Sequence, residues 1–109
     1  MIPDFKPDMS VSVAALHLLL AQHGEVVDLP LEWRIDRQGV ISPFLPVNDE
    51  QCEQAAQLLA AALELTVELF EYQHEGVPMR SYRVEGRWGG APWWFVAYTV
   101  VQPEPGALL

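Results

Sequence analysis

The sequence predicts an α+β protein in which an antiparallel sheet of about five strands carries two helices, packed mainly on one face. Apolar residues recur at helical spacing in two stretches and at alternating positions in several short ones, separated by turn residues. The stretch Trp93 to Val101 is apolar at both parities, which is typical of a strand covered on both faces. We expect one domain over residues 1–109, with the order α-β-β-α-β-β-β.

The chain should begin with an extended lead-in over residues 1–9, followed by the first helix. Ser10 is suited to cap this helix, which should run to about His23 and end at Gly24. Its side chains are apolar nearly all round. Such a helix is either deeply buried or partly covered by another chain.

Residues 31–36 have the clearest strand pattern, with Leu31, Trp33 and Ile35 alternating with polar side chains. The turn that follows, residues 36–39, places Gly39 in the left-handed conformation. A short strand over residues 40–42 should return beside the first, and the prolines after it suit an edge position.

Asn48 should cap a second helix, with Gln51 at the capping-box position and the end near Glu64. Its buried stripe begins at Cys52. Three strands follow, at 65–72, 77–85 and 93–101, and residues 102–109 should form a loose tail.

Within the first of these three strands, the apolar parity changes between Leu69 and Phe70. We interpret this change as a bulge.

The composition of the chain excludes several classes of function. The net charge of −9 with a single lysine opposes direct nucleic-acid binding, which needs clustered cations. No apolar run reaches the roughly 18 residues of a membrane span. Cys52 is the one cysteine, so no internal disulfide forms and a reducing bacterial cytoplasm is the expected location.

Motifs for catalysis and cofactors are lacking. The three histidines, His17, His23 and His74, are not spaced as zinc ligands, and Cys52 lies in an apolar stripe. Gly89-Gly90 has neither the spacing nor the Lys-Ser/Thr of a phosphate loop. We therefore expect no metal or cofactor and favour a non-catalytic protein, although a catalytic carboxylate pair stays open.

The best contact candidates are Arg87, Trp88, Trp93 and Trp94, which lie in or beside a glycine-rich turn. Trp88 at the tip either anchors a partner or folds back over the sheet. The expected partner is another protein or a second copy in a homodimer, the latter suggested by the apolar first helix.

Two alternatives remain. A small-molecule-binding domain or minor enzyme would use an aromatic pocket lined by Trp33, Tyr72, Tyr82 and Tyr98. An inhibitor that imitates DNA, of the anti-restriction or anti-CRISPR type, would use the glutamates of the middle third. Those glutamates could instead pair across strands with Arg80, Arg83 or Arg87.

Several short motifs are shared with other proteins: His17-Leu18-Leu19-Leu20, Asp28-Leu29-Pro30, Trp33-Arg34-Ile35 with Gly39, and Ala60-Ala61-Ala62-Leu63. With these the chain resembles small uncharacterised actinobacterial proteins of Streptomyces type, over about two thirds of its length. The resemblance implies a bacterial, cytoplasmic protein, one that accompanies plasmids, phages or integrated elements. It implies no activity for any residue.

Overall fold

The computed structural model describes residues 9–47 and 49–101. Its helices are α1 (Met9–Gln22), α2 (Gly24–Val27) and α3 (Cys52–Leu63), and its strands are β1 (Glu68–His74), β2 (Val77–Trp88) and β3 (Ala91–Val100). The α+β class and the antiparallel sheet are confirmed. The expected lead-in (except Met9, which is helical), the Asn48 cap and the tail at 102–109 lie outside the described residues.

The sheet has three strands in the order β1-β2-β3, not five. Both pairs are antiparallel, and the register of β1 on β2 runs from Glu68 opposite Arg83 to His74 opposite Val77 without interruption. The predicted bulge at Leu69-Phe70 is therefore wrong. The apolar parity changes because β1 is exposed on both faces, so neither face imposes a pattern on its side chains.

Residues 31–36 and 40–42 do not form regular strands, and this corrects the expected strand count. They make a hairpin held by isolated bridges, Glu32 with Phe44 and Ile35 with Ile41. Pro30 and Pro46 flank the hairpin and Pro43 lies within it, and none of them has an N–H, which limits the backbone hydrogen bonds that this segment can make. Ile41 also bridges Trp93 at the edge of β3, which attaches this hairpin to the sheet.

Other features of the 31–44 hairpin agree with the sequence pattern. Leu31, Trp33 and Ile35 are half-buried and pack against the core, while the residues between them are exposed. Gly39 has a φ of 77°, and its N–H donates to the Asp36 carbonyl at 3.0 Å. The left-handed turn expected at this glycine is confirmed.

The helix ends differ in one respect from expectation. Gly24 begins the short α2 and does not terminate α1 in a left-handed conformation. The end of α3 near Glu64 is confirmed, because Glu64 has a φ of 57° and its N–H donates to the carbonyls of the last turn.

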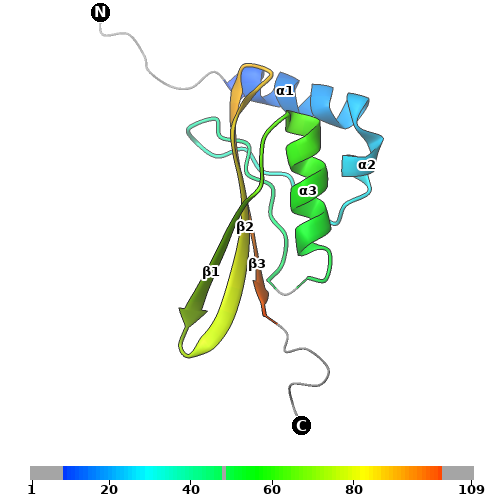
Figure 1. Cartoon of the computed structure of the whole chain (residues 1–109). Coiled ribbons are helices and arrows are strands. Elements are labelled where there is room, and N and C mark those ends of the chain that lie inside the picture. The colour runs from blue at the N-terminus through cyan, green and yellow to red at the C-terminus, as the bar shows by residue number, and fades with distance from the viewer. Residues whose placement is uncertain (1–8, 48, 102–109) are drawn as a thin grey trace, which may run out of the picture.

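The core lies between α3, α1 and one face of the sheet (Figure 1). Alanines 55, 56, 60 and 62 of α3 are buried, and such small side chains allow close approach to Val84, Phe95 and Ala97 of β2 and β3. At the edge of this core, the buried Ser12 hydroxyl of α1 donates to the Gly39 carbonyl at 2.6 Å. This hydrogen bond joins α1 to the 31–44 hairpin.

Helix α3 is much shorter than the strand it covers. Twelve helical residues span about 18 Å, whereas the twelve residues of β2 span about 40 Å. The β1–β2 turn therefore projects beyond the helices, as Figure 1 shows.

Candidate functional site

Strand β3 has one covered face and one open face. Trp93, Phe95 and Ala97 point into the core, and Trp93 is only 2% exposed. On the opposite side Trp94 is 44% exposed and Tyr98 is 37% exposed. Cover on both faces was the expectation from the sequence. Among the described residues the helices cover one face only, so the side chains of Trp94 and Tyr98 on the other side of this apolar strand remain exposed.

The strand register extends the open surface across the sheet. Phe70 of β1, Ser81 of β2 and Tyr98 of β3 form one row, and Tyr72, Met79 and Val100 form the next. We call the apolar side chains on this side the outer sheet face: Phe70, Tyr72, Val77, Met79, Trp94, Val96, Tyr98 and Val100. Large contiguous apolar surfaces on monomeric proteins usually serve binding.

Charged groups at the outer sheet face lie against its rings. The Arg83 guanidinium lies 4.8 Å from the centre of the Phe70 ring, although Glu68 is its direct cross-strand neighbour. Beside β3, the Arg34 guanidinium lies 4.6 Å from the centre of the Phe44 ring. These aromatic rings thus bind guanidinium groups within the molecule.

The predicted cross-strand ladder forms in part. Arg80 donates to the Glu71 carboxylate at 2.9 Å, on the opposite side of the sheet from Phe70. Arg87 instead donates to the carbonyl of Gly90 at 3.1 Å. Because the Arg80–Glu71 pair is largely exposed, solvent screens the attraction and the pair contributes little to stability.

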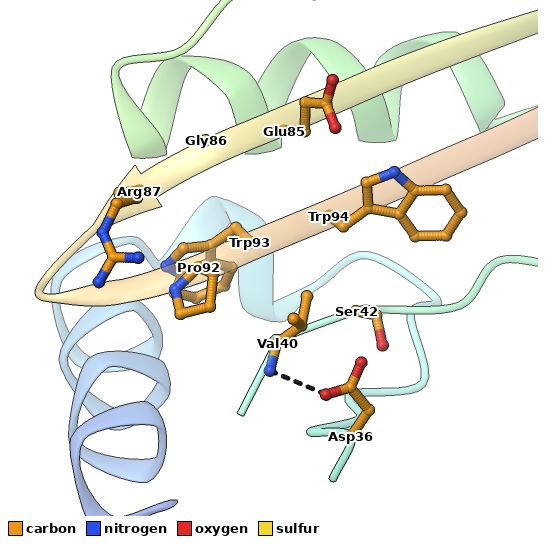
Figure 2. Close-up of a pocket in the computed structure, with 9 residues that line it drawn as sticks. All are labelled: Asp36, Val40, Ser42, Glu85, Gly86, Arg87, Pro92, Trp93 and Trp94. Carbon is orange, nitrogen blue, oxygen red and sulfur yellow. Dashed lines mark hydrogen bonds between the residues drawn. The ribbon is translucent and has the colours of Figure 1, made fainter. Parts of the chain in front are cut away.

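A recess of about 580 Å³ opens at the β2–β3 turn end of the outer sheet face (Figure 2). It is lined by Asp36, Val40, Ser42, Glu85, Gly86, Arg87, Pro92, Trp93 and Trp94. Glu85 lies directly opposite Trp94 in the strand register, whereas Asp36 and Ser42 come from the 31–44 hairpin. We call this the Trp94 recess.

The four contact candidates from the sequence lie near one another but face different ways. The Trp88 ring meets Trp93 edge to face at 6.0 Å, and the Trp93 indole donates to the Trp88 carbonyl at 3.0 Å. Trp88 is half-buried and packs against the core. Arg87 and Trp94 are exposed and both line the Trp94 recess.

The four aromatic pocket candidates do not share a pocket. Tyr82 is buried on the helix-covered side of the sheet, and Trp33 is half-buried in the 31–44 hairpin. Tyr72 and Tyr98 lie on the outer sheet face. The recess found here is lined by Asp36 and Glu85, which sequence reasoning missed as site residues. The available signal was the hairpin expected at Gly89-Gly90, since a two-residue turn there pairs Glu85 with Trp94 on one face.

Cys52 lies at the start of α3 and is buried, and its thiol donates to the Tyr98 carbonyl at 3.4 Å. Burial raises the pKa of the Cys52 thiol, and the nearby Asp49 charge raises this pKa further. Both effects disfavour the thiolate that a nucleophile needs. The residue therefore serves the core, as its place in the apolar stripe indicated.

Metal binding and membrane crossing have no support in residues 9–47 and 49–101. No group of three histidine, cysteine or carboxylate side chains in these ranges is placed to hold a metal ion. The helices within the same ranges are too short or too polar to cross a bilayer.

The fold and its surfaces define a small α+β protein whose three-stranded sheet is covered on one face and carries an aromatic recess on the other. Comparison of the chain with models of protein families, with curated proteins and with solved structures finds no match. Function must therefore be argued from these surfaces.

Proposed function

We propose that the protein is a non-catalytic interaction module of the bacterial cytoplasm, which binds another protein through the outer sheet face. The observation that carries this proposal is the exposure of Phe70, Trp94 and Tyr98 on a single sheet face. Aromatic side chains supply much of the binding energy at protein interfaces, and they are rigid enough to bind at low entropic cost.

Affinity capture from a lysate of the source organism tests this function. Phe70→Ser with Tyr98→Ser removes two rings from one row of the outer sheet face, so a partner retained by the wild-type protein should be lost. The matched control, Gln73→Ala with Thr99→Ala, changes the same strands on the opposite face. Retention of every captured protein by the ring-deleted variant would refute the proposed surface.

Self-association is the second part of the proposal, and it rests on α1. This helix contains no Asp, Glu, Lys or Arg, although the chain carries a net charge of −9. Val13 is 55% exposed and Leu18 is 41% exposed on it. Because two acidic copies repel elsewhere, an uncharged apolar helix is the surface on which they can meet.

Light scattering measures this association. We expect a dimer for the wild-type protein and a monomer for Val13→Glu with Leu18→Glu, since each dimer would then bury four carboxylates. The control Val47→Glu with Leu69→Glu adds the same charge at exposed sites away from α1 and should remain dimeric. A wild-type protein that stays monomeric at millimolar concentration contradicts the association.

One observation favours a second candidate function, the binding of a small molecule. The volume of the Trp94 recess exceeds the roughly 300 Å³ at which ligand pockets begin, and Asp36, Glu85 and Arg87 are titratable groups on its walls. The DNA-imitating inhibitor stays a prediction. Glu68 and Glu71 lie on opposite faces of β1 and so present no single row of negative charge.

A further inference from the structure

We propose that the Trp94 recess binds a positively charged side chain, an arginine or lysine, from a basic segment of the partner protein. This inference rests on the proposed interaction through the outer sheet face and specifies the chemistry of the partner. Three observations support this inference: the recess itself, the carboxylates of Asp36 and Glu85 on its walls, and the Trp94 ring beside them.

The two carboxylates of the recess are available for an incoming cation. Asp36 Oδ1 accepts hydrogen bonds from the backbone N–H groups of Gln38 at 2.8 Å and Val40 at 3.0 Å. These bonds hold the carboxylate in place, and Figure 2 shows its second oxygen turned toward the sheet. The Glu85 carboxylate makes no hydrogen bond or ion pair with any residue that the structure describes.

The Trp94 ring is the aromatic wall of the recess. Nearby, the Phe44 and Phe70 rings already hold Arg34 and Arg83. Within residues 9–47 and 49–101 no cationic side chain lies over Trp94. Indole binds cations better than a phenyl ring does, so the strongest cation-binding ring of this surface is available to an external group.

Arg87 makes one end of the recess positively charged. Figure 2 shows its guanidinium at the opposite end from Trp94, where it donates to the Gly90 carbonyl. The lining therefore carries two carboxylates against one guanidinium. An incoming cation is repelled from the Arg87 end and attracted to the Trp94 end.

A partner segment fits this recess better than a free small cation. Small ligands usually bind in concave sites that bury most of their surface, whereas this recess is open and continues into the outer sheet face. A second hollow of about 230 Å³ shares the Trp94 wall and is lined by Phe44, Val96 and Tyr98. An extended basic segment can place a cation in the first hollow and apolar atoms in the second. The chain's net charge of −9 attracts such a segment.

The test is titration of the full-length protein with a hexa-arginine peptide, followed by calorimetry and by the NMR signals of the indole N–H groups. We expect the Trp94 indole signal to shift and Trp94→Ala to weaken binding about threefold or more, with Trp94→Phe restoring part of the loss. Asp36→Asn keeps an acceptor oxygen for the two backbone N–H groups. Combined with Glu85→Gln, it should weaken binding about tenfold.

The matched control is Glu50→Gln with Glu53→Gln, which removes the same two charges near the start of α3. It should weaken hexa-arginine binding less than about twofold. Equal losses in both charge-deleted variants would mean that the acidic surface as a whole attracts the peptide, and the proposed site would fail. Binding of free arginine amide as tight as that of the peptide would overturn the partner segment in favour of a small cation.

Failure here is distinguishable from failure of the proposed function. If hexa-arginine does not bind, while the Phe70→Ser/Tyr98→Ser variant still loses its captured partner, the outer sheet face remains an interface and only the cation site is rejected.

Discussion

Replacing Trp93 by alanine should lower the free energy of unfolding by about 3–5 kcal/mol, the usual result of truncating a buried aromatic side chain. Trp93 is 2% exposed, meets the Trp88 ring edge to face and donates its indole N–H to the Trp88 carbonyl. The substitution therefore removes apolar burial, a ring contact and a hydrogen bond together. Urea unfolding followed by circular dichroism measures the change.

The adjacent residue is a matched control. Trp94→Ala removes the same indole from a side chain that is 44% exposed, and it should cost at most about 1 kcal/mol. The pair of variants thus separates stability from binding at neighbouring positions. Equal destabilisation by the two substitutions would contradict the assignment of Trp93 to the core and of Trp94 to the outer sheet face.

Gly86→Ala should destabilise the protein by about 2–4 kcal/mol, combining backbone strain with a steric clash. Gly86 has a φ of 154°, a conformation that side-chain-bearing residues rarely adopt. A β-carbon added there would lie 2.6 Å from Cδ2 of Leu65, a residue that packs against the core. Chemical denaturation measures this loss of unfolding free energy, provided that the dependence of the free energy on denaturant concentration is the same for both proteins.

Gly76→Ala is the control for the backbone contribution alone. Gly76 has a φ of 80° in the β1–β2 turn, and an added β-carbon would meet nothing within 4 Å. We expect a loss of about 1 kcal/mol for this left-handed position. If Gly86→Ala costs no more than Gly76→Ala, Leu65 does not crowd position 86. Coupling between Gly86→Ala and Leu65→Ala in a double-mutant cycle would verify the clash directly.

The two proposed interaction surfaces involve different side chains, so each can be tested with its own variants. Helix α1 and the outer sheet face lie on different elements, although Val11 and Ser12 of α1 line a hollow that also includes Arg87 of the Trp94 recess. A dimer formed through α1 would leave both outer sheet faces open. Each copy could then bind a partner, and the pair would bind a two-site target more tightly than either copy alone.

Helices α1 and α3, the Gly39 turn and the alternation of residues 31–35 could be predicted because they depend on near neighbours in the chain, whereas the short α2 was not predicted. Helical periodicity over Cys52–Leu63 and the left-handed preference of glycine act within a few residues. The same local pattern predicted two strands, at 31–36 and 40–42, that the sheet does not contain. Alternation shows which side chains turn inward, but a continuous ladder also needs backbone donors, and Pro43 of the 31–44 hairpin has no N–H to donate.

The candidate site could not be predicted because its residues are far apart in the sequence. In sequence, Asp36 lies far from Glu85 and Trp94, and the Ile41–Trp93 bridge brings the hairpin to the edge of β3. The aromatic pocket expected from Trp33, Tyr72, Tyr82 and Tyr98 failed to assemble because strand parity sends Tyr82 to one face and Tyr98 to the other. Aromatic composition alone carries no information about which face a ring occupies.

The chain's own pattern specifies that β3 is apolar on both sides and that α1 is uncharged; whether those surfaces are covered depends on how the elements pack. Two helices of 14 and 12 residues can shield one side of a sheet whose central strand has 12. The 31–44 hairpin borders the other side along β3 but leaves Trp94 and Tyr98 exposed. Apolar side chains placed there by strand alternation must remain in contact with water until a partner covers them.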